Sequence, residues 1–348
     1  MDSAFYSFFM TLVVVLGLCV GSFLNVVALR FLSEESITYP ASHCPRCKTP
    51  IRPYDNIPVI SYLLLKGQCR SCKTHISIQY PLVELATGVL FGFTFWQFGM
   101  QWQTVVLWFL LANLMVIFIT DWREKLIFEL NSLPLIPVGL GFNWFSGGLF
   151  ASTGQIAPPF VFKLGLFSLV IPEAVISALL AMAIVFAFFE GMILLSRVAF
   201  GTDGFGHGDT HLMMGAGAFL GMPLTLLALL LGFIAQSIPA IPMLIIGWIR
   251  NRQYISLISG SVALIGSALP LLILNMPPDF PILPPIRGIL CIAGLLLAII
   301  GLVVFLRQVR QHENYTYLPL GPALILGIII ALFWGKPLLE GYMAFIHR

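Results

Sequence analysis

Residues 5–29 read FYSFFMTLVVVLGLCVGSFLNVVAL, a run without a single charged side chain. A helix needs about 20 apolar residues to cross the hydrocarbon core of a bilayer, so this stretch is long enough to span a membrane. It has no basic segment before it and no small-residue cleavage motif after it, which a signal peptide would carry. We therefore expect it to be retained as a transmembrane helix.

Further apolar runs of similar length recur along the whole chain. The composition is 59% hydrophobic and 9% charged, whereas soluble domains carry about 25% charged residues. The sequence predicts an all-α polytopic membrane protein with about eight to ten transmembrane helices and the lipid bilayer as its surroundings. The expected spans are 5–29, 82–98, 104–120, 127–149, 171–196, 212–231, 233–249, 255–275, 287–306 and 318–334. There is no basic run outside short loops, so we expect no nucleic-acid partner.

The positive residues indicate an orientation. With the N-terminus outside, all but four of the 18 Lys and Arg residues fall on the cytoplasmic side, the four being Lys163, Arg287, Lys336 and Arg348. Short cytoplasmic loops carry an excess of Lys and Arg. We therefore expect a multi-pass membrane protein with its N-terminus outside. The polar segment 30–80 is then cytoplasmic, and segments 150–170 and 276–286, the latter rich in proline, lie outside.

Four of the six cysteines form two CxxC pairs in this polar segment. Each pair can present two thiolates to one metal ion from a tight turn, and two pairs complete a tetrahedral site. The alternative is two disulfides, which do not persist in a reducing cytoplasm. We therefore expect a structural zinc site in a small ribbon, with the ligands Cys44, Cys47, Cys69 and Cys72.

Two aspartates lie at the ends of apolar spans, where an ionisable residue is expensive and marks a functional site. Asp121 follows the apolar run 105–120, and Asp209 lies in GFGHGDTH, residues 204–211. In the predicted topology both are at cytoplasmic helix ends. Two carboxylates close together share one proton, so one can take a proton from water while the other donates to a peptide carbonyl. Gly204, Gly206 and Gly208, which precede Asp209, leave room for close approach of backbone or substrate.

Each aspartate also has a plainer interpretation. Asp121 could be an interfacial charge paired with Arg123 or Lys125, and Asp209 could be a helix N-cap. The pair on one side of the membrane favours the catalytic interpretation.

The chain resembles the bacterial type IV prepilin peptidases, within the GxGD group of intramembrane aspartyl proteases. Five motifs carry the resemblance, and they occur in the order found in that family. They are Gly21–Arg30 in the first helix, the two CxxC pairs followed by residues 76–85, Asp121, residues 206–221 around Asp209, and LPLGPAL at 318–324.

The resemblance implies a bifunctional enzyme with Asp121 and Asp209 as its catalytic pair. Such an enzyme is a multi-pass protein of the bacterial inner membrane, and it removes the leader peptide of type IV prepilins and pseudopilins on the cytoplasmic side. It then methylates the new N-terminus with S-adenosylmethionine. Glu84, at the start of a span, is the candidate for handling the substrate amine, and its alternative is an interfacial carboxylate that reaches toward water.

Three features depart from the family pattern. Phe128 and Glu129 stand where a Pro-Asp or similar pair is usual, and His211 replaces a lysine. The predicted spans also exceed the usual eight. We accordingly expect a first helix at 1–29, a cytoplasmic ribbon loop at 30–80, a catalytic membrane core at 81–250, an inserted hairpin at 251–310 and a C-terminal helix region at 311–348.

Two other functions fit part of the sequence. A proton-coupled transporter would explain the membrane carboxylates, but it gives no reason for the ribbon or for the glycines before Asp209. An inactive assembly scaffold with the same fold would explain the departures at Phe128 and His211.

Overall fold

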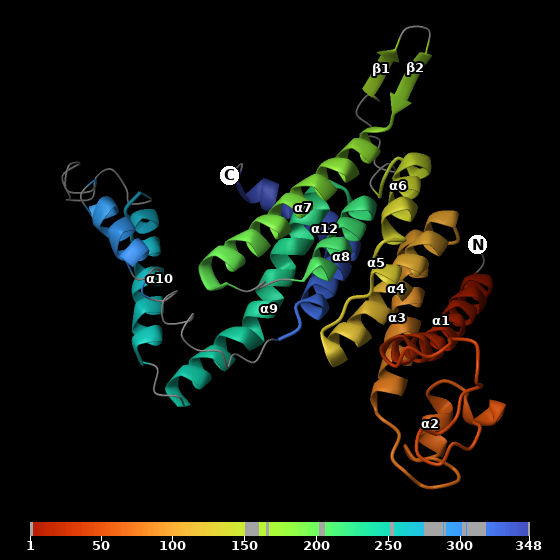
Figure 1. Cartoon of the computed structure of the whole chain (residues 1–348). Coiled ribbons are helices and arrows are strands. Elements are labelled where there is room, and N and C mark those ends of the chain that lie inside the picture. The colour runs from red at the N-terminus through yellow and green to blue at the C-terminus, as the bar shows by residue number, and fades with distance from the viewer. Residues whose placement is uncertain are drawn as a thin grey trace. The chain divides into compact units, whose positions relative to one another are not determined.

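The chain folds almost entirely into helices, as predicted, with one small hairpin of strands (Figure 1). The computed structural model describes residues 3–149, 160–164, 167–201, 206–250, 254–274, 288, 290–300, 304 and 318–346. The principal elements are α1 (Ser3–Leu32), α2 (Ile60–Leu64), α3 (Gln79–Phe98), α4 (Trp102–Glu124), α5 (Glu129–Ser132), α6 (Leu135–Ser146), β1 (Phe160–Leu164), β2 (Phe167–Ile171), α7 (Glu173–Phe200), α8 (His207–Leu220), α9 (Met222–Arg250), α10 (Tyr254–Leu274) and α12 (Gly321–Ile346).

Five of the described helices are long and apolar enough to cross a membrane, namely α1, α4, α7, α9 and α12. Helix α3 has 20 residues and α10 has 21. The prediction of a polytopic helical membrane protein is confirmed. The proline-rich stretch 276–286, expected to be an extended connector, lies outside the described residues.

Two predicted span boundaries are wrong. Spans 212–231 and 233–249 were expected to break near Gly232, but α8 ends at Leu220 and α9 runs unbroken from Met222 to Arg250. The break falls at Gly221, whose φ of +71° a glycine adopts easily. The expected span 127–149 is divided into α5 and α6, and Pro134, at the N-cap of α6, separates them.

The described chain divides into two compact units. The first contains residues 1–191, 205–235 and 319–348, and it includes every predicted site residue. The second contains residues 192–204 and 236–318. Within the second unit, α10 packs closely on the helical residues 290–300, because a Cβ at Gly266 would lie 2.5 Å from the backbone nitrogen of Ala298. Within the predicted hairpin near 255–306, the described helical segments 254–274 and 290–300 thus pack against each other.

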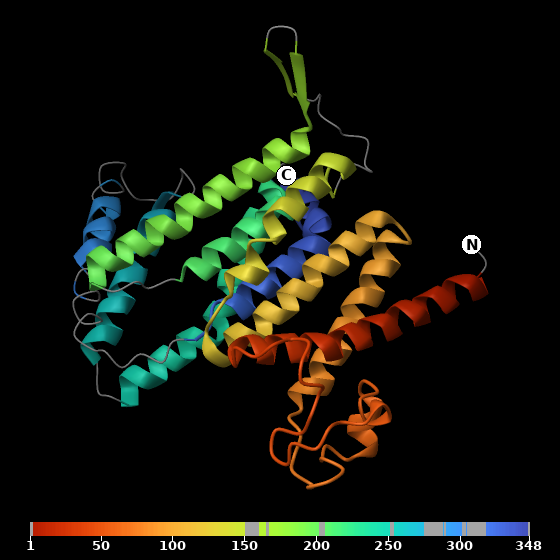
Figure 2. The ribbon, with the colours of Figure 1, turned by 45° about the vertical axis from the view of Figure 1, so that its right-hand side comes forward.

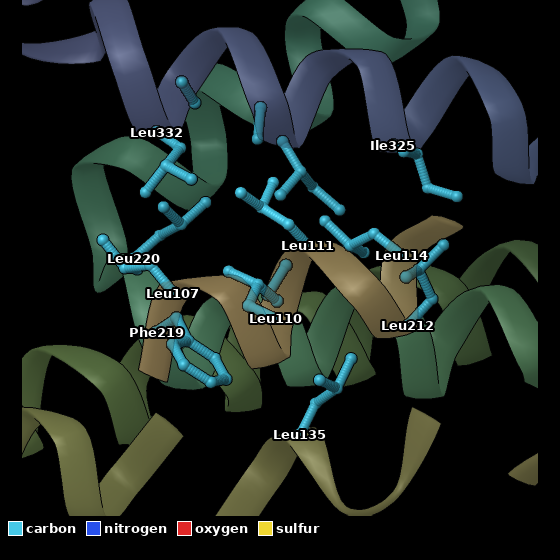
Figure 3. Packing of buried hydrophobic residues seen from close by; sticks show 14 of the residues in the cluster. Leu107, Leu110, Leu111, Leu114, Leu135, Leu212, Phe219, Leu220, Ile325 and Leu332 are labelled. Carbon is cyan, nitrogen blue, oxygen red and sulfur yellow. The ribbon is translucent and has the colours of Figure 1, made fainter. Parts of the chain in front are cut away.

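Helix α4 lies at the centre of the first unit. Its residues 107, 110, 111 and 114 are leucines at helical spacing, and none is more than 2% exposed. Around them Figure 3 shows Leu135 of α6, Leu212 and Phe219 of α8, and Ile325 and Leu332 of α12. Helix α12 lies alongside both α4 and α8 (Figure 2). The fold thereby brings the C-terminal helix against the two helices that carry the predicted aspartates.

Small residues allow the closest helix contacts in this unit. A Cβ at Gly21 of α1 would lie 2.8 Å from the Cα of Glu84 in α3. A Cβ at Gly327 of α12 would lie only 2.2 Å from the carbonyl oxygen of Ala228 in α9. Glycine at such positions lets two backbones touch, which is the main source of helix association in lipid. Gly232 belongs to the same contact, so it packs α9 against α12 and does not break the helix.

We expect Gly327→Val to destabilise the bundle by about 1–3 kcal/mol, the usual effect of overpacking, because its side chain meets backbone that cannot move aside. Gly341→Val in the same helix is the matched control, since nothing lies within 4 Å of its Cβ position. Thermal unfolding of the purified protein in detergent measures both. Equal melting temperatures for the two variants would show that the α9–α12 contact is not tight.

Candidate active site and cysteine ribbon

Asp121 lies in the last turn of α4, and its side chain is buried. It is 5% exposed, at the end of the apolar run that forms the centre of the unit. The backbone N–H of Gly321, the first residue of α12, donates a hydrogen bond of 2.9 Å to its Oδ2. The first N–H groups of a helix have no partner within the helix and carry partial positive charge. The start of α12 therefore holds the Asp121 carboxylate in place.

Only glycine fits at the position that makes this contact. A Cβ on residue 321 would lie 2.5 Å from Asp121 Oδ2 and 3.0 Å from its Cγ. The Leu-Pro-Leu-Gly-Pro stretch that carried part of the family resemblance thus contributes directly to the surroundings of the first aspartate.

Asp209 lies in the first turn of α8, facing the same region. It is the third residue of the helix, and its carboxylate is hydrogen-bonded to the backbone of Gly206, the N-cap residue. The alternative that Asp209 is itself the N-cap is wrong. Its carboxylate lies close enough to that of Asp121 for the two charges to repel each other. This interaction supports the pairing of the two aspartates, which stays a prediction.

Gly208 explains how α8 approaches so closely. A Cβ on this residue would lie 2.6 Å from the Cβ of Ile127, in the segment that follows α4. Gly208 thus allows the start of α8 to lie against the segment after α4. Gly321 likewise allows the start of α12 to lie against the end of α4. Gly204, also predicted to help, lies outside the described residues.

Two histidines flank Asp209. His207 Nδ1 lies 3.1 Å from Oε1 of Glu190, which lies within the apolar helix α7 and so has a partner there. His211 lies on the same face of α8 as Gly208 and Gly215, which contact residues 127–135. Its Nδ1 atom is buried and makes no hydrogen bond within the described chain.

Glu84 joins three parts of the first unit. It lies in the second turn of α3, is 6% exposed, and is hydrogen-bonded to the side chain of Ser22 in α1. The backbone N–H of Val59, in the ribbon loop, donates a hydrogen bond of 2.7 Å to its Oε2. The alternative of a carboxylate that reaches toward water does not describe this buried group.

The aspartate pair and Glu84 lie at the same end of the helices. Arg123, two residues after Asp121, donates from Nε to Gln79 Oε1 at 2.8 Å, which joins the end of α4 to the start of α3. The rings of Phe31 at the end of α1 and Phe128 at the start of α5 are 5.8 Å apart. Phe128, which departs from the family pattern, thus packs against the end of α1.

The four predicted cysteine ligands come together in the ribbon. Their sulfur atoms all lie within 4.8 Å of one another, with 3.8 Å between Cys44 and Cys72 and 4.0 Å between Cys47 and Cys69. A tetrahedral zinc ion with bonds of about 2.3 Å separates its sulfurs by about 3.8 Å. A disulfide would bring a pair of sulfurs to about 2.05 Å. The arrangement therefore fits a four-thiolate metal site.

The two CxxC turns share one backbone conformation. Both read CxxCKT, and in each the first cysteine N–H bonds to the threonine carbonyl (Thr49 or Thr74), while the lysine has φ +57°. Hydrogen bonds with Thr49, chiefly with its side chain and to a smaller extent with its backbone, lower the pKa of Cys47 to about 6. A lowered pKa favours the thiolate, the form that binds metals.

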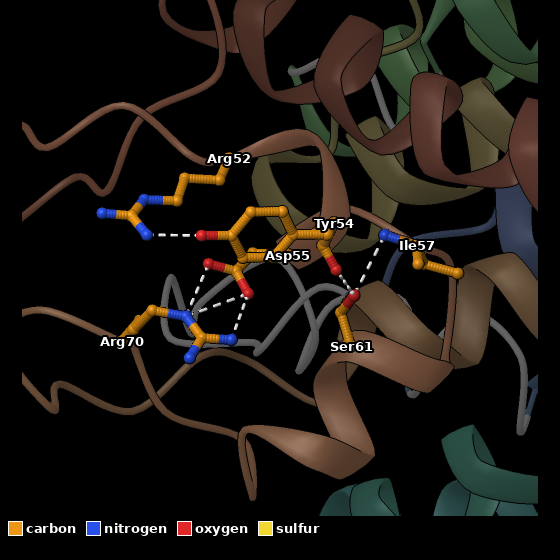
Figure 4. A network of polar contacts seen from close by, with 6 residues as sticks. All are labelled: Arg52, Tyr54, Asp55, Ile57, Ser61 and Arg70. Atoms are coloured by element: carbon orange, nitrogen blue, oxygen red, sulfur yellow. Dashed lines mark hydrogen bonds and ion pairs between the residues drawn. The ribbon is translucent and has the colours of Figure 1, made fainter.

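A polar network connects the second CxxC pair to the rest of the ribbon (Figure 4). Arg70, between Cys69 and Cys72, binds both oxygens of Asp55, with contacts of 2.8 Å from Nε and 2.6 Å from Nη2. These hydrogen bonds hold the pKa of Asp55 below its usual value. Ser61 continues the network by donating to the carbonyl of Tyr54 at 2.9 Å. The segment that carries Val59 is thus fixed to the cysteine cluster.

Fold and site together define a polytopic membrane protein with paired carboxylates at helix ends and a cysteine ribbon on the same side. Residues 15–98 match the family model of the bacterial peptidase A24 N-terminal domain, and residues 108–241 match that of the type IV leader peptidase family. The chain belongs to this family. The predicted family and enzyme class are confirmed at this level.

Curated relatives agree. Each of the following is named prepilin leader peptidase/N-methyltransferase. The chain is 37% identical to the protein from Neisseria gonorrhoeae over 62% of its own length and 75% of the relative. It is 34% identical to the one from Pseudomonas aeruginosa over 68% and 81%, respectively. It is 30% identical to the one from Aeromonas salmonicida over 70% and 84%. No solved structure matches the chain significantly.

Sequence reasoning missed three contributors to the site. Gly321 could have been found, because a Gly-Pro pair at the start of an apolar run marks a helix start. Ser22 lay within the quoted first-helix motif without a role. Val59 gave no signal, since nothing in the sequence indicates its backbone angles, φ +62° and ψ −50°.

We expect the purified protein to contain one zinc ion per chain, and Cys44→Ser or Cys69→Ser to lose it, because three thiolates hold zinc less tightly than four. Metal analysis after gel filtration measures the content. Cys291→Ser is the matched control, since Cys291 lies far along the chain from the cluster. Zinc retained in full by both ribbon variants would contradict the assignment.

Proposed function

We propose that the protein removes the leader peptide of type IV prepilins and pseudopilins by aspartyl protease chemistry at Asp121 and Asp209. The observation that carries the proposal is the convergence of three helix ends on the two carboxylates. The start of α12 bonds to Asp121 through Gly321, and the start of α8 carries Asp209, whose carboxylate interacts electrostatically with that of Asp121. The names of the relatives support the substrate class.

The chemistry follows from two neighbouring carboxylates that share one proton. The ionised carboxylate takes a proton from a water molecule as its oxygen attacks the scissile carbonyl carbon, and the protonated carboxyl donates to the carbonyl oxygen. The tetrahedral intermediate then collapses, the C–N bond breaks and the amine leaves with a proton from the pair. The Gly321 N–H keeps the Asp121 carboxylate oriented through both steps.

We place this reaction on the cytoplasmic side of the bacterial inner membrane, with the N-terminus outside. The excess of Lys and Arg in the segments that flank the site supports this orientation. The buried position of Asp121 at the end of α4 agrees with a site at the border of the bilayer, where a leader peptide and a membrane-embedded helix of the substrate meet.

The second proposed activity is N-methylation of the amine that cleavage exposes. When bound, S-adenosylmethionine supplies the methyl group. Glu84 is the proposed group that receives the substrate amine, because a buried carboxylate attracts an ammonium and can accept its proton. Ser22 and the Val59 N–H fix its orientation. The shared end of α3 and α4 places this residue on the same side as the aspartates.

Asp121→Asn and Asp209→Asn are each expected to lower cleavage of a model prepilin by about 10²–10⁴-fold, since an amide cannot take a proton from water. Glu124→Gln, at the exposed end of the same helix, is the control and is expected to cleave normally. Cleavage is measured in membrane vesicles, from the increased mobility of the shortened substrate on a denaturing gel. Undiminished cleavage in either aspartate variant would exclude the pair as the catalytic groups.

Glu84→Gln is expected to lower N-methylation by about 10²-fold relative to cleavage, because glutamine keeps the shape and loses the base. Mass spectrometry of the mature N-terminus gives the methylated fraction at matched extents of cleavage. Glu124→Gln, the same change at an exposed position of α4, is the matched control. A parallel fall of both activities would assign Glu84 a structural role instead.

A further inference from the structure

A cavity of about 320 Å³ lies between α1 and two segments of the ribbon, residues 37–42 and 56–58. The residues that α1 contributes are 19, 22, 23, 26 and 30, which lie on one face of the helix at its ribbon end. Sites for small molecules and cofactors enclose about 300–1,000 Å³. The cavity is therefore large enough for a ligand of nucleoside size.

One wall of the cavity carries a positive charge without a counterion. Arg30 is 8% exposed, and its Nη1 donates to the carbonyls of Ser36 and Ile37 at 2.7 and 2.8 Å, while Nη2 donates to that of Pro40. No ion pair in the described part of the chain includes it. Carbonyl dipoles satisfy donors, but they do not neutralise a buried guanidinium. Two of its five N–H groups remain available for an anion.

The other walls offer what a nucleoside needs. Phe23, Ile37 and Pro58 provide apolar surface for a planar base. Ser42 and Asn56 provide hydrogen-bonding groups for ribose hydroxyls.

The cavity borders the Glu84 contact on two sides. Ser22 lines the cavity and is also hydrogen-bonded to Glu84. Pro58 lines the cavity and precedes Val59, whose N–H donates to Glu84. A ligand in the cavity is therefore separated from the proposed amine site by one side chain and one peptide unit.

We propose that this cavity binds S-adenosylmethionine, with the carboxylate of its amino-acid part on Arg30 and its adenosine part between Phe23 and the ribbon. The inference rests on the proposed N-methylation and adds where the methyl donor binds. The ribbon thereby supplies half of a ligand site, a role beyond holding a metal.

The test measures binding, not turnover. Zinc-loaded full-length protein in phosphatidylcholine nanodiscs is titrated calorimetrically with S-adenosylhomocysteine, the product form of the donor. Val26→Phe fills the cavity, and Arg30→Lys removes the forked geometry that binds carboxylates. Each is expected to weaken binding about tenfold or more. Val15→Phe is the matched control, since it makes the same change on an exposed part of α1 outside the cavity and is expected to bind like wild type.

Zinc content and gel filtration show that each variant is folded, so loss of binding in Val26→Phe with zinc retained supports the site. Wild-type affinity in both Val26→Phe and Arg30→Lys, with methylation by the wild-type protein intact, would overturn the inference and leave the proposed function standing. If the wild-type protein neither binds the ligand nor methylates a cleaved substrate, both the assignment of this cavity and the proposed methylation are wrong. Because Phe23 is 54% exposed, nanodiscs with phosphatidylglycerol form a further arm. Displacement of the ligand by this lipid would identify a headgroup site instead.

Discussion

A carboxylate at the end of a buried apolar helix needs a hydrogen-bond donor that does not cancel its charge, and the Gly321 N–H supplies this donor to Asp121. An Arg or Lys in its place would form an ion pair and remove the carboxylate from acid–base work. A helix N-terminus offers only partial positive charge. This contact holds the start of α12 against the end of α4. Farther along α12, Gly327 lies against Gly232 of α9 and brings these two helices together.

The same constraint explains where glycines occur around the aspartates. Backbone groups can approach a carboxylate or a neighbouring helix only where no Cβ intervenes, and Gly208 and Gly321 are the positions where a Cβ would collide. In lipid, such contacts are also the main attraction between helices. Catalytic geometry and membrane packing therefore require the same residue type, so a glycine-rich motif beside an aspartate serves both.

The sequence was sufficient for the class of fold and the cysteine cluster, because both depend on residue type and spacing, whereas the role of the two aspartates stays a prediction. It was insufficient where a glycine had two possible roles. The boundary between two predicted spans fell at Gly232, but this glycine lies inside α9 and packs it against α12. The helix break falls at Gly221, which has φ +71°. The partners of Glu84 were also beyond reach, since Ser22 and Val59 lie 62 and 25 positions away in the sequence, and only tertiary packing joins them. Glu190 was similar, as its histidine lies 17 positions along the chain.

Val59 shows what the ribbon contributes physically. A β-branched residue at φ +62° is a genuine outlier, and such a conformation costs about 1–3 kcal/mol and persists only where the surroundings fix it. Neither hydrophobic cluster includes a buried residue of the ribbon, so the fixing comes from polar contacts. The Arg70–Asp55 contact holds the segment before Val59 to the second cysteine pair, and Ser61 holds the segment after it. Without these ties the peptide would relax and turn its N–H away from Glu84. The polar contacts of the ribbon therefore fix the one strained peptide unit that binds Glu84.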